Sequence, residues 1–165
     1  AWQLLFAQSW RLGRDAGAPR IGAHFDYASG GGAYEGGTLG NAGTPYGNNI
    51  YYAYGLFLTP TNLIAFAPNF SFAPLPDLRL TLEYQMTWRE DTDDAIYRSN
   101  GTAYAGTPGS GGSKTGDVAR LQAVWTITPR LSMTLRLEHL SADGGLRDNG
   151  YRSSDFAAAL ANYRF

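Results

Sequence analysis

The stretch LRLTLEYQMTWR, residues Leu78–Arg89, carries the clearest structural pattern in this chain. Apolar side chains occupy every second position from Leu78 to Trp88, and polar or charged side chains occupy the positions between them. This period of two predicts a β-strand with one apolar and one polar face. A helix would scatter both sets of side chains around its circumference, so the pattern excludes a helix here.

The same alternation recurs along the rest of the chain. It is regular in three further stretches, Arg20–Tyr27, Ala119–Ile127 and Arg130–Glu138. It is less regular in three others, Trp2–Leu12, Asn62–Phe72 and Asp155–Phe165. We expect strands of roughly 10 to 13 residues, longer than the ~5–6 usual in soluble sheets and close to the ~9–11 of a tilted membrane strand. The chain is therefore predicted to be all-β.

The predicted connections fall into two classes. Short turns are expected at residues 13–18, 73–77 and 128–129, and long polar loops at residues 30–60, 91–116 and 143–154. Short turns at one end and long loops at the other are typical of a transmembrane antiparallel up-and-down β-barrel. A soluble β-sandwich is the alternative, because its strands also alternate.

The number of strands depends on Ile50–Leu58. If this segment is part of one long loop folded toward the pore, the chain has seven strands; if it is a strand, the chain has eight. We favour seven, because eight would place the long loop before Ile50 on the same side as the short turns. Seven strands cannot form a complete even-numbered barrel. Residues 1–165 are therefore expected to be a single β-barrel domain or the C-terminal part of a larger one.

Composition excludes several classes of function. The chain has 165 residues, 44% of them hydrophobic, a net charge of -1 and no cysteine. The lack of cysteine rules out disulfide frameworks, Cys-ligated zinc and thiol nucleophiles. A net charge near zero argues against a nucleic-acid partner. Ser29, His24 and Asp26 lack a nucleophile elbow and an oxyanion hole, so we predict neither an enzyme nor a cofactor.

The polar face of the predicted strands carries most of the charge. On the membrane interpretation, the apolar face meets lipid and the polar face lines a lumen. The alternation assigns seven arginines to that lumen: Arg11, Arg20, Arg79, Arg89, Arg120, Arg136 and Arg164. It assigns three carboxylates to the same face, those of Asp26, Glu83 and Glu138. Three carboxylates cannot neutralise seven guanidinium groups, so a net positive lumen is predicted.

Arginine is the residue expected where carboxylates or other anions are bound. Only one of the 13 basic residues, Lys114, is a lysine. A guanidinium group stays charged and meets a carboxylate through a planar fork of two donors. We place Arg79, Arg120 and Arg136 near mid-strand and the other four arginines toward the rims. The alternative is that each arginine pairs with a neighbouring carboxylate and braces the wall.

Clustered acids in one loop are a candidate cation site. Asp91, Asp93 and Asp94 could offer carboxylate oxygens to calcium. The spacing lacks the glycine and the terminal glutamate of an EF-hand, and exposed acidic loops are common. We therefore predict no metal site and keep these three residues as a weak calcium candidate.

Five short motifs resemble the alginate export family of outer-membrane β-barrels, in its C-terminal portion. They are Phe25–Gly30, Tyr51–Gly55, Thr61–Leu63, Asp94–Tyr97 and the terminal Tyr163–Phe165. The resemblance implies a porin-like barrel in the bacterial outer membrane, with lipid and lipopolysaccharide around it. It also implies that Tyr163 and Phe165 act as a signal to the barrel-insertion machinery.

The function expected from the resemblance and the charge pattern is passive transport. The channel would conduct an anionic solute, an alginate-like polysaccharide or small anions, through the arginine-lined lumen. Two alternatives remain: a general small-solute porin, and a non-conducting structural β-barrel subunit of a membrane assembly.

Overall fold

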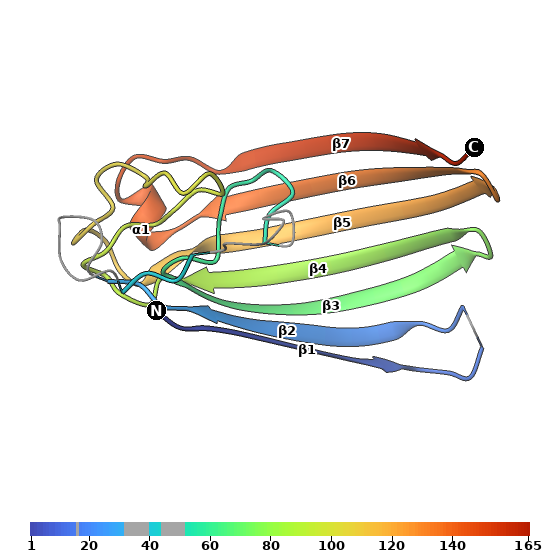
Figure 1. The fold of residues 1–165 in the computed structure, drawn as a ribbon, viewed down its shortest axis with the longest axis horizontal. Helices are drawn as coiled ribbons and strands as arrows, with labels where there is room; N and C mark the ends of the chain where they lie inside the picture. Colours follow the sequence, from blue (N-terminus) through green and yellow to red (C-terminus); the bar gives the residue numbers. More distant parts are fainter. Residues whose placement is uncertain (16, 32–39, 44–51) are drawn as a thin grey trace.

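The computed structural model describes every residue of the chain except 16, 32–39 and 44–51. It is one antiparallel sheet of seven strands, each hydrogen-bonded to the next in chain order (Figure 1). The strands are β1 (Gln3–Arg11), β2 (Arg20–Ala28), β3 (Leu63–Leu75), β4 (Leu78–Trp88), β5 (Lys114–Thr128), β6 (Leu131–Ala142) and β7 (Ser154–Tyr163). The all-β prediction is confirmed. The sheet is open, with β1 and β7 at its edges.

The two ends of the sheet differ as predicted (Figure 1). At one end, called here the turn end, short connections join β1 to β2, β3 to β4 and β5 to β6. At the other, the loop end, three long connections join the remaining neighbours, and the last of them holds the short helix α1 (Gly144–Arg147). Among the described residues, no helix has the length and apolar character needed to cross a membrane.

The segment between β2 and β3 decides the strand count. Its described residues 52–58 form no strand, so the seven-strand prediction is correct and the eight-strand alternative is wrong. Ile50 and Tyr51, which begin the expected loop element, lie outside the described residues. Residues 52–58, called here the Tyr54 segment, fold back from the loop end across β5 and β6 (Figure 1).

The register between strands gives the sheet two chemically different faces. The outer face exposes large apolar side chains, among them Trp10, Phe25, Phe66, Phe70, Leu82, Trp125, Met133, Leu135 and Leu137. An exposed apolar surface of this extent marks a face that contacts either a protein partner or a membrane. The inner face carries the polar positions of β4, β5 and β6, among them Glu83, Arg120 and Glu138, together with apolar residues such as Ala65 and Val118.

Burial on the inner face is concentrated at the loop end. There Leu58, Ile96, Val118, Leu140 and Leu146 form an apolar cluster between the loops and the sheet. Toward the turn end the same face is exposed, for example at Arg20, Thr126 and Asn162. The loops therefore cover one half of the inner face and leave the other half open.

Candidate functional site on the inner face

Charged side chains on neighbouring strands meet in one row across the inner face. Glu83 on β4 is the register partner of Arg120 on β5, and Arg120 is the partner of Glu138 on β6. Register partners on one face of an antiparallel pair have Cβ atoms about 4.5–5.5 Å apart. The alternation of each strand and the in-step register together bring these three residues into contact.

Arg120 is the centre of this row. Its Nη1 lies 2.7 Å from Oε1 of Glu83, and its Nε lies 3.0 Å from Oε2 of Glu138. Its Nη2 also donates to Oε1 of Gln85 on β4. Arg120 is 6% exposed and Glu138 is 3% exposed. Arg120 therefore matches the alternative in which an arginine pairs with neighbouring carboxylates and braces the wall. Its buried charge lies between two opposite charges.

The Tyr54 segment is fastened to the same row. The carboxylate of Glu138 accepts hydrogen bonds from the backbone N–H of Tyr54, at 2.6 Å, and from that of Gly55, at 3.1 Å. A side chain at Gly55 would force the Phe57 ring to move, because the added Cβ would lie 2.5 Å from it. The next residue, Leu56, takes a φ of 60°, a left-handed conformation that is uncommon for leucine.

The ring of Tyr54 covers two guanidinium groups. Its centroid lies 4.9 Å from Cζ of Arg136 and 5.4 Å from Cζ of Arg120. Both distances are within the range of cation–π attraction. The Tyr54 hydroxyl also donates to Oε1 of Gln122, at 3.3 Å, which accepts from Nε of Arg136 at 3.2 Å. Burial raises the pKa of Tyr54, so the hydroxyl stays neutral.

A second buried polar group braces β2 against β4. Nδ1 of His24 lies 2.6 Å from Oδ2 of Asp26, and its Nε2 lies 3.4 Å from Oε2 of Glu83. The intervening strand β3 contributes the fully buried Ala65 and Ala67, whose small side chains leave room for these contacts. Glu83 therefore joins this group to the row centred on Arg120.

Arg89 is placed differently from the other arginines assigned to the lumen. It is 1% exposed and lies at the loop end, directly after β4. Its guanidinium donates to backbone carbonyls of the β4–β5 loop, those of Asp94, Thr107, Ser110, Gly111 and Gly112. Burial lowers its pKa. These contacts stabilise the conformation of the β4–β5 loop. Strand alternation alone could not show whether Arg89 contacts this loop or lies at the rim of the lumen.

The other five predicted lumen arginines lie toward the turn end of Arg120. They are Arg11, Arg20, Arg79, Arg136 and Arg164. Arg11 and Arg20 are register partners, and Arg136 is the partner of Gln122. Within the described part of the chain, none of the five forms an ion pair with a carboxylate. The inner face thus has a buried, charge-paired half at the loop end and an exposed cationic half at the turn end.

The acidic loop is used for structure. Oδ2 of Asp94 accepts from the N–H of Gly31 at 2.9 Å, and its Oδ1 accepts from the Tyr97 hydroxyl at 2.7 Å. Oδ1 of Asp91 accepts from the N–H of Asp93 at 2.9 Å. Over the described ranges, no three acidic, histidine or cysteine side chains are placed to hold a metal ion. The calcium candidate therefore gains no support.

Sequence reasoning left out three residues of the site. Gln85 and Gln122 stand at polar positions of the predicted strands, but they carry no charge and did not enter the charge count. Tyr54 lies in the segment expected to fold toward the pore, and its position between two arginines depends on tertiary structure. Counting amides as well as charges would have found the two glutamines.

Comparison with known families agrees with this description. A family model described as Alginate export matches residues 1–159. The match covers six strands and the first part of β7. A search of curated proteins finds no match to this chain.

Proposed function

This chain belongs to the alginate export family of outer-membrane transport proteins, and we propose that it forms channel wall for an anionic polysaccharide. In this proposal the solute is alginate-like and moves passively, without a chemical reaction. The inner face lines the pore, and the outer face meets the lipid and lipopolysaccharide of the bacterial outer membrane. Tyr163 and Phe165 serve the insertion machinery.

The outer face supports a membrane location. Along β6 it carries Leu131, Met133, Leu135 and Leu137, which span about 20 Å at ~3.4 Å per residue. The apolar band of an outer-membrane barrel is about 25 Å tall. The next residue of β6 on the outer face, toward the loop end, is His139. Its side chain is exposed, and its Nδ1 lies 2.7 Å from Oδ1 of Asp155. The apolar band therefore ends where a polar surface begins.

The observation that carries the proposal is the set of five arginines without an ion pair. Arg120 is neutralised by two carboxylates, but the arginines closer to the turn end have no such partner among the described residues. A low-dielectric wall focuses the field of these guanidinium groups along the pore. Several weak contacts in sequence would attract a polyanion and still release it, as conduction requires.

The Tyr54 segment supplies the narrowing in this proposal. It lies against the inner face over β5 and β6, with its backbone fixed by Glu138 and the Tyr54 ring over Arg136. A solute arriving from the turn end would pass the unpaired arginines first and then meet this segment. Pore width and charge would together select the solute.

Planar-bilayer recording of the full-length protein tests the proposal. Under a salt gradient, the reversal potential should show a preference for anions. The double variant Arg79→Glu with Arg136→Glu should weaken or reverse that preference. The control replaces two exposed loop-end arginines, Arg147→Glu with Arg152→Glu, and should change it little.

Three results would count against the proposal. A cation-selective wild-type pore would overturn the polyanion assignment. Weak selectivity that neither double variant changes would favour a general small-solute porin. An inserted protein that never conducts would favour a structural barrel subunit.

A further inference from the structure

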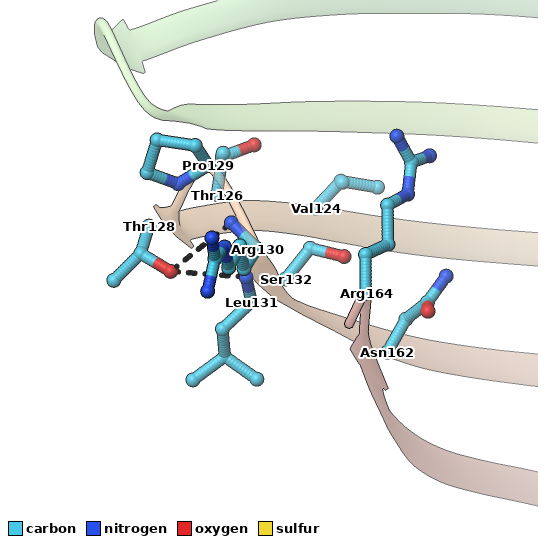
Figure 2. Close-up of a pocket in the computed structure, with 9 residues that line it drawn as sticks. All are labelled: Val124, Thr126, Thr128, Pro129, Arg130, Leu131, Ser132, Asn162 and Arg164. Atoms are coloured by element: carbon cyan, nitrogen blue, oxygen red, sulfur yellow. Dashed lines mark hydrogen bonds between the residues drawn. The ribbon is translucent and has the colours of Figure 1, made fainter.

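A second polar row lies on the inner face at the turn end, well away from Arg120. Thr126 on β5 is the register partner of Ser132 on β6, and Ser132 is the partner of Asn162 on β7. Together with Val124 these side chains line a cavity of about 240 Å³ (Figure 2). Two hydroxyl groups and one amide thus stand side by side on three neighbouring strands.

Two arginines border this row. The backbone N–H of Arg164 donates to the carbonyl of Arg130 at 2.8 Å, which fixes the end of β7 against the β5–β6 turn. The turn itself is held by Thr128, whose Oγ1 accepts from the N–H groups of Arg130 and Leu131 at 3.2 and 3.0 Å (Figure 2). Both guanidinium groups belong to residues that line the cavity. These contacts fix the backbone from which the two guanidinium side chains extend.

The residues that line the cavity include no carboxylate. The neighbouring β3–β4 turn contains an acidic residue, Asp77, which does not line the cavity. Its Oδ2 accepts a hydrogen bond of 2.8 Å from Nε1 of Trp125. Trp125 points to the outer face, so this carboxylate is held there as well. Among the described residues, no hydrogen bond occupies the side chains of Ser132, Asn162 or Arg164. The donors of the cavity are therefore open to a ligand.

We propose that this cavity binds one carboxylated sugar unit of an anionic polysaccharide, as the first subsite that the polymer meets at the turn end. The guanidinium groups suit the sugar carboxylate, which they bind through paired donors. Thr126, Ser132 and Asn162 suit the ring hydroxyls, because each can donate and accept. The cavity is smaller than the roughly 300–1,000 Å³ of drug-sized ligand pockets, so it suits a single unit.

This subsite rests on the proposed channel function, and its test separates the two. A trimer of mannuronic acid is added on the turn-end side of the full-length protein in a planar bilayer, and the concentration for half-block of the current is measured. Acetate, which has the carboxylate without the ring hydroxyls, is the comparison anion.

The proposal predicts a specific order of effects. Arg164→Ala should raise the half-blocking concentration of the trimer about tenfold or more, because a charge-assisted contact is lost. Asn162→Ala should raise it about fivefold and leave the effect of acetate unchanged. Arg14→Ala, an exposed arginine of the β1–β2 turn outside the cavity, is the matched control and should leave trimer block unchanged.

Each outcome has one meaning. If Arg164→Ala and Asn162→Ala behave like Arg14→Ala while the pore remains anion-selective, the subsite is wrong and the channel function stands. If the wild-type pore has no anion preference, the channel function fails on its own account. Arg130→Lys, which keeps the charge but loses the planar fork, is a second variant that perturbs the strands less; an unchanged trimer block would also contradict the subsite.

Discussion

The carboxylate of Glu138 on β6 accepts a 2.6 Å hydrogen bond from the backbone N–H of Tyr54, joining the wall of the sheet to a loop 84 positions away in sequence. The same carboxylate pairs with Arg120 and accepts from Gly55. One buried acidic group therefore holds the position of the Tyr54 segment and balances the central arginine.

We predict that Glu138→Ala both destabilises the fold and widens the pore. It leaves two backbone N–H groups without an acceptor and removes one of the two carboxylates of Arg120. Breaking a buried ion pair costs about 3–5 kcal/mol, so the free energy of unfolding should fall by that order. Urea unfolding in detergent micelles and single-channel conductance measure the two effects.

The control for this prediction is the exposed pair of His139 and Asp155 on the outer face. Asp155→Ala should cost at most about 1 kcal/mol, because exposed ion pairs contribute little. A Glu138→Ala channel with wild-type conductance would show that Glu138 does not hold the segment in place.

Replacing Tyr54 separates its ring from its hydroxyl. Tyr54→Phe keeps the ring over Arg136 and loses one hydrogen bond of 3.3 Å to Gln122, so it should cost about 1 kcal/mol. Tyr54→Ala removes the ring and should raise the conductance. A larger conductance in the Phe variant than in the Ala variant would contradict this assignment.

The same residue makes stability depend on pH. Burial raises the pKa of Tyr54 above its ordinary value of 10.0, outweighing the opposite effect of the nearby arginines. As pH rises past that value, the unfolded tyrosine loses its proton while the folded one keeps it. Stability from this residue is therefore present below pH 10 and declines above it. Tyr54→Phe should show a smaller alkaline loss in unfolding experiments.

Arg89 is predicted to stabilise the loop end without setting selectivity. Arg89→Ala leaves the carbonyls of Thr107, Ser110 and Gly111 without their donor. Charged hydrogen bonds contribute about 1.5–3 kcal/mol, so the β4–β5 loop should loosen and become open to limited proteolysis. The reversal potential should stay that of the wild type. A large shift in the reversal potential would instead show that Arg89 lies in the lumen and acts on the permeating ions.

Adjacent positions on β6 test which face meets lipid. Leu135 is on the outer face and Thr134 is on the inner face, as their register shows. Leu135→Arg should lower the free energy of unfolding in lipid vesicles by about 2–4 kcal/mol, the cost of a charge at the lipid face. Thr134→Arg should cost much less. Equal losses at both positions would argue against a lipid-facing outer surface.

Much of this architecture follows from periodicity. The alternation in Leu78–Arg89 predicts both a strand and the faces of its side chains, because successive Cβ atoms of a strand point to opposite sides. The inward positions of Arg120 and Glu138 follow in the same way. Their contact could not be predicted, since it depends on the register between β5 and β6, and a shift by one residue would send one of them to lipid.

By itself, the sequence determined an all-β chain with an apolar face, an arginine-rich polar face and two unlike ends. Those properties are local, because each follows from neighbouring positions along one strand. The contacts of the buried arginines depend on tertiary structure: Arg120 is paired with Glu83 and Glu138, and Arg89 donates hydrogen bonds to loop carbonyls. Tertiary structure also decided that the Tyr54 segment closes over the inner face. Contacts between residues far apart in the chain require the strands to be in register, and that information is absent from any single stretch.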